Sequence, residues 1–376
     1  MRVKILFFLL LFPLVPLFAL RSGDKISELQ GVRWLSGNPV RLYIPEGGQE
    51  LQYRVVVFVL THAPGTQETF RMLEDLQKKY SKTVRIAVVS PDPESDVKDL
   101  LSRMRKPAFS VAVDRDRKLV QKYMAGSMLY PMAFVASPGG VIAWNGEAAD
   151  LPELLAEAEK KPVDVEKQKK LSALLDELQV MMRDNTSRKM RHHVRGIFRL
   201  DPGNAAALRM TLFSLEHSGR IPEAWLILRE QLGAAPGKAR IYLTAMDLIA
   251  RYPVLAGELP GVVSRFVQNI RDLESCDAAV LTLLTRFSFS ADALLGAVKI
   301  YEAASSLTDN APAAQLAGHA AAGALLASRL GNWNKAVELQ TRSRRLWLDA
   351  GNAFSAAAAE RLLQYYQLCL KTKVKW

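Results

Sequence analysis

Cysteine is scarce in this sequence: only Cys276 and Cys369 occur among 376 residues, and both lie in the second half. They are far apart, so neither the short spacing of a cysteine zinc site nor that of a Cys-x-x-Cys redox site is present. In an oxidising compartment the two could form a disulfide, but buried apolar positions often hold a free cysteine. The sequence leaves these two outcomes open.

Uncharged apolar sequence of membrane-spanning length is also lacking. Arg2 and Lys4 precede a charge-free run over residues 5–20, the pattern of a signal peptide. That run contains two prolines and is short for a spanning helix. We expect residues 1–20 to be a signal peptide and the protein to be exported to the periplasm or another extracytoplasmic compartment. An uncleaved N-terminal anchor is the alternative.

Acidic residues are too few to balance the basic ones, and the net charge is +12. Residues 21–160 hold 19 Lys and Arg against 18 Asp and Glu, whereas residues 161–376 hold 29 against 20. The excess therefore belongs to the second half. Outside the cytoplasm, a basic surface suits anionic lipid, acidic glycan or acidic protein better than nucleic acid, so we expect no nucleic-acid partner.

Apolar runs alternate with charged segments in the first part of the chain. Residues 55–60 are uninterruptedly apolar, as strands buried on both faces require. The alternation predicts β-α-β crossovers and a mostly parallel sheet with helices on both faces. Residues 137–140 form a turn short enough for an antiparallel hairpin, which makes the sheet mixed. We expect strands at 55–60, 84–89, 108–113, 132–136 and 141–144, and helices at 66–80, 94–105, 115–125 and 151–161.

Strand signals end near Lys161, and Pro162 marks a predicted domain boundary. Residues 162–376 are rich in Ala, Leu and Arg, with loops marked by Gly, Pro and Asn. One helical stripe ends at Gly219, and another begins a few residues later. This pattern predicts an all-α domain of helical hairpins.

Motifs along residues 21–161 resemble, in order, the redoxin branch of the thioredoxin superfamily. Residues 23–26 look like its usual start, and residues 37–42 like its N-terminal hairpin. Residues 88–96 are similar to the strand-to-helix segment of alkyl hydroperoxide reductase-type peroxiredoxins and of Sco-type copper chaperones. Tyr130 and Pro131 match the family's cis-proline loop. The resemblance implies a thioredoxin-like domain with a central mixed sheet.

The family's redox motif follows the central strand, and here that place holds no sulfur. Ala63 and Thr66 stand where the two cysteines are expected. Dithiol exchange needs a thiolate at a helix N-terminus and a second sulfur, so we predict no catalytic residue, no cofactor and no metal at this site. A base–hydroxyl pair of His62 and Thr66 is the alternative, but no orienting group is visible. The degenerate motif comprises His62, Ala63, Pro64, Gly65 and Thr66.

The second domain resembles tetratricopeptide repeats. Residues 200–205 look like the usual start of a repeat, while Leu212 and Gln231 depart from the pattern because small residues normally stand there. The resemblance implies an α-solenoid whose concave face binds peptide or protein. The matching turn, packing and stop positions are Gly219, Ala224, Leu228 and Pro236.

The densest basic stretch is predicted to lie on one helical face, formed by Arg188, Arg191, Arg195 and Arg199. A solvated outer face of the solenoid is the favoured interpretation. A contact face for an acidic partner or an anionic envelope surface is the alternative.

Together these features predict an exported, non-catalytic interaction protein. It would bind other proteins or peptides through the helical repeats and a groove beside Pro131. The alternative is an exported oxidoreductase or redox accessory protein of the cell envelope that uses Cys276, Cys369 or a partner's chemistry.

Overall fold

The computed structural model describes residues 19–43, 53–104, 106–125, 130–183, 187–287 and 290–372, without the side chains of residues 183 and 187–189. The predicted signal peptide therefore lies almost entirely outside the described residues. The chain divides into two compact units, Met1–Glu177 and Leu178–Trp376. Among the helices in the described ranges, none is long and apolar enough to span a membrane.

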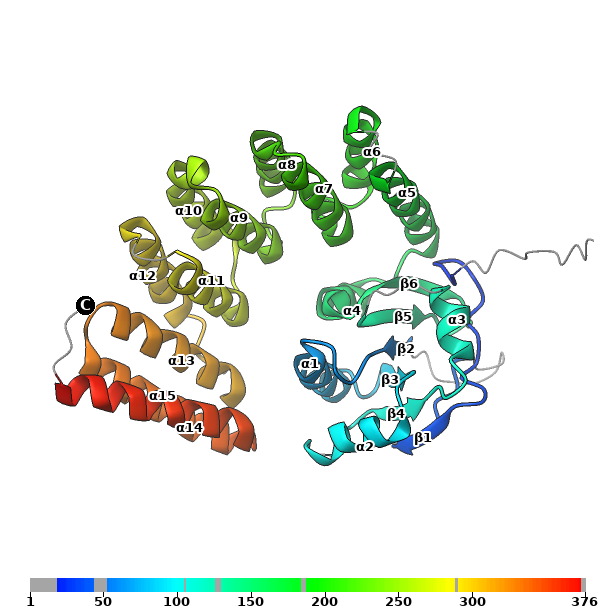
Figure 1. The fold of residues 1–376 in the computed structure, drawn as a ribbon, viewed down its shortest axis with the longest axis horizontal. Coiled ribbons are helices and arrows are strands. Elements are labelled where there is room, and N and C mark those ends of the chain that lie inside the picture. The colour runs from blue at the N-terminus through cyan, green and yellow to red at the C-terminus, as the bar shows by residue number, and fades with distance from the viewer. Residues whose placement is uncertain are drawn as a thin grey trace, which may run out of the picture. The chain divides into compact units, whose positions relative to one another are not determined.

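The first unit is built on a six-stranded mixed sheet with the order β1-β4-β3-β2-β5-β6 (Figure 1). β2, β3 and β4 are mutually parallel, β5 runs antiparallel to β2, and β1 and β6 are antiparallel edge strands. The strands are β1 (Arg33–Ser36), β2 (Tyr53–Phe58), β3 (Val84–Ser90), β4 (Ser110–Val113), β5 (Met132–Ala136) and β6 (Ile142–Glu147).

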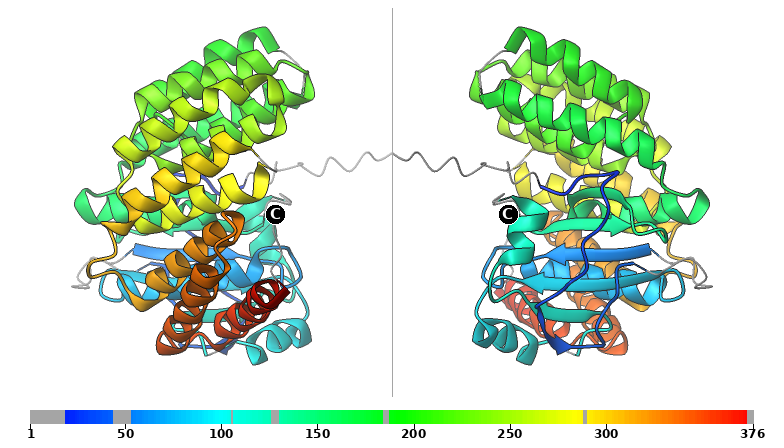
Figure 2. Two further views of the ribbon diagram at one scale, coloured as in Figure 1. Left: turned by 90° about the vertical axis from the view of Figure 1, so that its left-hand side faces the viewer. Right: turned by 90° about the vertical axis from the view of Figure 1, so that its right-hand side faces the viewer.

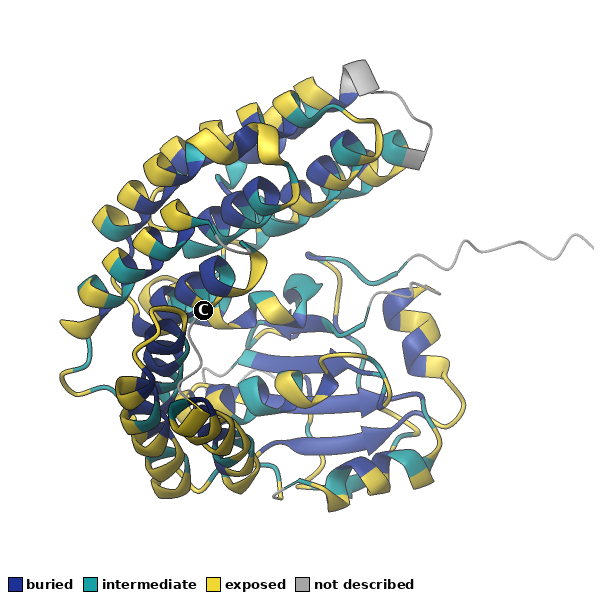
Figure 3. Ribbon diagram, turned by 60° about the vertical axis from the view of Figure 1, so that its left-hand side comes forward, coloured by how far each residue is buried: buried dark blue, intermediate teal, exposed yellow. Residues whose placement is uncertain are grey.

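Helices cover both faces of this sheet, which explains why its central strands are apolar on both sides. Val55 and Val57 of β2 pack into the core that α1, α2 and α4 complete, whereas Val56 and Phe58 pack toward α3 and the N-terminal segment. The central strands are accordingly buried along their length, and each helix is buried on one side (Figure 3). The helices are α1 (Thr66–Lys79), α2 (Glu94–Ser102), α3 (Lys118–Met124) and α4 (Leu151–Lys160), with a 3-10 turn η1 (Ala148–Asp150).

The hairpin of β5 and β6 lies where the sequence predicted it, but the predicted N-terminal hairpin at residues 37–42 is wrong. Residues 37–43 form no strand, and β1 pairs with β4 instead. The Ser110 hydroxyl donates a 2.6 Å hydrogen bond to the carbonyl of Asn38, which holds the segment after β1 against β4. Pro39 has no amide hydrogen to donate to a strand partner.

The second unit is entirely helical in its described ranges. Its helices pack as successive hairpins, with α11 contacting α9, α12 and α13, and they lie side by side in both views of Figure 2. The predicted fold class, a mixed α/β sheet unit followed by an all-α unit, is confirmed. The helices are α5 (Val165–Arg183), which begins in the first unit, α6 (Ser187–Leu200), α7 (Ala205–His217), α8 (Ile221–Ala234), α9 (Ala239–Arg251), η2 (Pro253–Glu258), α10 (Leu259–Asn269), α11 (Leu273–Arg286), α12 (Ala291–Ser305), α13 (Ala313–Arg329), α14 (Trp333–Asp349) and α15 (Ala353–Thr372).

Gln231, which departs from the small-residue pattern of the resemblance, has a structural role. Its side-chain Oε1 accepts a 2.9 Å hydrogen bond from the buried amide of Gly203, in the loop between α6 and α7. Gly203 has a φ of +72°, a conformation that favours glycine. The Gln231 side chain therefore joins α8 to the loop between α6 and α7.

Candidate functional site at the turn between β2 and α1

Backbone hydrogen bonds close the turn in which the sequence predicts the degenerate motif. The Ala63 amide donates to the Leu60 carbonyl at 3.2 Å, and the Thr66 amide donates to the Ala63 carbonyl at the same distance. Gly65, with a φ of +83°, then leads directly into α1. Residues 60–66 are thus a compact turn at a helix N-terminus.

Neither position expected for cysteine presents a nucleophile. The Thr66 side chain is buried, and its Oγ1 lies 2.7 Å from the carbonyl oxygen of Leu60 and 2.9 Å from that of Ala63. The hydroxyl hydrogen is therefore donated to the backbone. Ala63 offers only a methyl group, so the turn carries out neither thiol nor hydroxyl chemistry.

Asp92 holds this turn to the next strand, a role that sequence reasoning missed. Its Oδ2 accepts hydrogen bonds from the Thr61 amide at 2.6 Å and from the Thr61 hydroxyl at 2.8 Å. Phe58 and Val89 are register partners in parallel strands, and Thr61 and Asp92 each follow three residues later. Because β2 and β3 are parallel neighbours, the residues that follow them lie close together, and this could have predicted the contact between Thr61 and Asp92.

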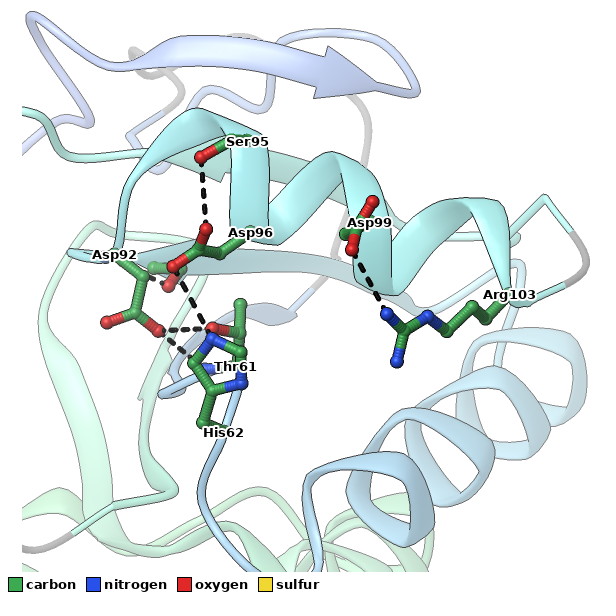
Figure 4. A network of polar contacts seen from close by, with 8 residues as sticks. Thr61, His62, Asp92, Ser95, Asp96, Asp99 and Arg103 are labelled. Carbon is green, nitrogen blue, oxygen red and sulfur yellow. Dashed lines mark hydrogen bonds and ion pairs between the residues drawn. The ribbon is translucent and has the colours of Figure 1, made fainter.

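The His62 side chain points toward the carboxylate of Asp96 on α2 (Figure 4). Its Nε2 lies 3.4 Å from Oδ2 of Asp96, and its side chain is 81% exposed. An exposed ion pair of this length contributes little to stability. The structure does not bring His62 and Thr66 together as a base–hydroxyl pair.

A cavity of about 340 Å³ opens beside the turn, between α1 and α2. Its rim is predominantly acidic: Glu68, Asp96 and Asp99 face it, and the guanidinium of Arg103 donates to Asp99 at 3.0 Å. Such a surface suits a polar or cationic segment better than an anion. His62 also lines this cavity, beside Asp96.

The cis-proline loop predicted at Tyr130 and Pro131 lies beside this turn, and the peptide bond between these residues is cis. The carbonyl of Pro131 accepts a 3.0 Å hydrogen bond from the Ala148 amide. Burial, and then the Asp92 carboxylate, raise the pKa of Tyr130, and Arg117 opposes them. The phenol is therefore protonated at neutral pH and can donate a hydrogen bond.

The predicted basic face on α6 is partly neutralised by α8. Arg191 forms an ion pair with Glu223, and Arg195 lies 3.5 Å from Glu230. Arg199 is exposed, and the side chain of Arg188 is outside the described residues. The two glutamates, seven residues apart on α8, contact two arginines that are four residues apart on α6. The sequence of α6 alone does not predict these contacts between helices.

Both cysteines are buried and free in the helical unit. Burial, then the carboxylates of Asp272 and Asp277, raise the pKa of Cys276 to about 11, with Arg271 opposing. Since the thiolate is the reactive form, the raised pKa keeps Cys276 in its less reactive, protonated form at neutral pH. Across the described ranges, no three His, Cys, Asp or Glu side chains gather as a metal site.

No protein-family model and no curated protein matches this chain. Solved structures similar to it include StoA from Bacillus subtilis, 16% identical, covering 34% of this chain and 99% of that one at a TM-score of 0.27. The exposed lipoprotein thioredoxin Etrx1 from Streptococcus pneumoniae is 16% identical over 34% and 98%, at 0.28. The bacterioferritin comigratory protein of Xanthomonas campestris is 18% identical over 34% and 87%, at 0.27. The thioredoxin-like description of the first unit rests on its own sheet order and strand directions.

Proposed function

We propose that this protein is an exported, non-catalytic interaction module of the cell envelope, in which a thioredoxin-like unit without active-site sulfur and a helical repeat unit bind other proteins or peptides. One observation carries the proposal. At the turn after β2, Ala63 supplies a methyl group and the Thr66 hydroxyl is donated to the Leu60 carbonyl. Recognition is the activity that such a turn can support.

Insulin reduction and peroxide consumption, each with an added dithiol reductant, test this proposal against the oxidoreductase alternative. We expect the purified full chain to add nothing to the rate of the reductant alone, because Cys276 and Cys369 are buried. The C276S/C369S variant is the control for any thiol contribution. Turnover by the wild type that disappears in this variant would refute the proposal.

The binding role of the first unit is tested by photo-crosslinking. Gln67 lines the cavity beside the turn, whereas Lys79, at the other end of α1, is also exposed but does not line it. A photoreactive residue at position 67 is expected to capture peptides that the same residue at position 79 does not. Equal capture from both positions would show that the cavity is not the peptide-binding site.

Export is proposed from the basic start and apolar run of residues 1–20. Fusing these residues to a reporter that is active only outside the cytoplasm is expected to yield an active reporter. Replacing Arg2 and Lys4 by Glu should reduce that signal. An inactive fusion would contradict export.

A further inference from the structure

α15 has apolar side chains on both of its sides. Its inner side is buried against α14 and α13, through residues that include Leu363, Tyr366 and Cys369. On its outer side, Leu362 is 47% exposed, Tyr365 46% and Leu368 58%. A helix that is apolar all round is normally packed all round.

The exposed apolar residues of α15 recur along one face of the helix, which Arg361 interrupts at its middle. Positions 354, 358, 361, 365 and 368 follow the alternating spacing of four and three that places side chains on one helical face. Arg361 occupies the middle of this face and is exposed. We call this set the α15 outer stripe: Phe354, Ala358, Arg361, Leu362, Tyr365 and Leu368.

The surroundings of the α15 outer stripe are cationic. Residues 313–372 hold seven Lys and Arg against three Asp and Glu, a net charge of +4. Glu360 is already paired with Arg344 at 2.5 Å, and Glu338 with Lys335 at 2.7 Å. The guanidinium of Arg329 is close enough to lower the pKa of Tyr365, against the larger raising effects of the Cys369 hydrogen bond and burial. An occupant of the stripe therefore meets apolar side chains among uncompensated positive charges.

Two occupants fit this charge pattern poorly. In an antiparallel pairing of two copies centred on the stripe, Arg361 would face Arg361 of the other copy, and like charges at an interface are costly. In a membrane, the guanidinium at the centre of the stripe would have to enter the acyl boundary, while interfacial helices keep cations on their polar face. A carboxylate from a partner helix can instead pair directly with Arg361.

We infer that the α15 outer stripe is a docking site for an acidic amphipathic helix of another protein, whose apolar side covers Tyr365 and Leu368 and whose carboxylates pair with Arg361. This inference rests on the proposed interaction function and names its partner's chemistry. A helix laid into an apolar surface is a recurring mode of peptide recognition.

The probe is a pair of synthetic helical peptides about 18 residues long, or five turns. Both carry leucine on one face; one has glutamate along the flanks, and its twin has lysine at those positions. Fluorescence anisotropy with the full chain measures binding to each peptide. The variants are L368E and R361E, and L295E is the matched control because Leu295 on α12 is 54% exposed, similar to Leu368.

Wild type and L295E are expected to bind the glutamate peptide, and L368E to bind it at least about tenfold more weakly, a difference of about 1.4 kcal/mol. R361E should prefer the lysine twin. Circular dichroism checks that each variant is folded.

Four results would overturn the inference: no binding of the glutamate peptide, binding that L368E leaves unchanged, self-association that L368E abolishes, or sedimentation with anionic vesicles that L368E abolishes. If L368E binds the peptide as tightly as the wild type, the α15 outer stripe is not the binding site, but the proposed non-catalytic function is unaffected. The absence of catalysis is tested separately, by the turnover assay.

Discussion

Replacing Gly323 with alanine tests how closely α12 and α13 pack. A Cβ added at Gly323 would lie 2.5 Å from Cζ and 2.9 Å from Cε2 of Tyr301, both too close for real atoms. The Tyr301 ring has little room to move, because it stacks on His319 with ring centroids 4.4 Å apart and planes 11° apart. His319 is in turn held by Asp277, with 2.7 Å between Nδ1 and Oδ1.

The sign of the change in unfolding free energy follows from one stabilising and two destabilising contributions. Alanine in place of glycine inside a helix stabilises by about 1 kcal/mol, while overpacking a core costs about 1–3 kcal/mol. Displacing Tyr301 would also disturb the buried hydrogen bond of His319, at about 1–3 kcal/mol. We therefore expect Gly323→Ala to lower the free energy of unfolding by about 1–5 kcal/mol, the two costs less the gain in helix propensity.

Gly318, in the same helix, is the matched control. The nearest atom to a Cβ there is Oδ2 of Asp277 at 3.9 Å, an ordinary contact. Gly318→Ala should therefore gain the full helix propensity and raise the free energy of unfolding by up to about 1 kcal/mol.

Urea unfolding followed by circular dichroism compares the midpoints of the two variants at constant slope. Adding Tyr301→Ala to Gly323→Ala should relieve the overlap, so that the alanine at 323 becomes stabilising in that background. Equal midpoints for the two glycine variants, or no rescue by the tyrosine change, would refute the packing described here.

Three further outcomes follow from single contacts. In the A63C/T66C variant, air oxidation should form a disulfide, seen as no gain in titratable thiols, because the hydrogen-bonded turn from 63 to 66 holds the two Cα atoms within bridging range. Gln231→Ala should lower the melting temperature because it leaves the buried Gly203 amide without its acceptor, at a cost of about 1–3 kcal/mol. Burial raises the pKa of Asp277 despite its hydrogen bond to His319, so its contribution to stability is greatest below about pH 4 and declines as pH rises through the raised folded pKa. The unfolding midpoint of D277N should lack that decline, and an unchanged pH profile would contradict this.

Much of the first unit could be predicted because its signals are local. The apolar run from Val55 is buried on both faces, and the observed strand and helix boundaries differ from the predicted ones by a few residues. The pairing of β1 with β4 was not predictable from neighbouring residues, because it joins residues 80 positions apart, such as Arg33 and Val113. Backbone pairing between distant segments has no local sequence signature.

In the helical unit, apolar periodicity indicates which side of α6 is buried but not which polar residues of other helices it meets. Val194 and Phe198 are buried opposite the arginines of α6, as their spacing predicts. The glutamates of α8 that pair with those arginines, and the contact of Asp277 with His319, arise only when two helices meet. Periodicity therefore predicts which side of a helix is buried, whereas its polar partners depend on neighbouring hairpins.

The turn after β2 explains why a resemblance in fold does not carry a reaction with it. Its shape depends on the amides of Ala63 and Thr66 and on the Asp92 carboxylate that accepts from Thr61. None of these contacts involves sulfur, so the turn can form whether positions 63 and 66 hold thiols, a methyl group or a hydroxyl. Fold and chemistry are separable here. Chemistry at this turn therefore has to be judged from the side chains at positions 63 and 66, which are a methyl group and a buried hydroxyl bonded to the backbone.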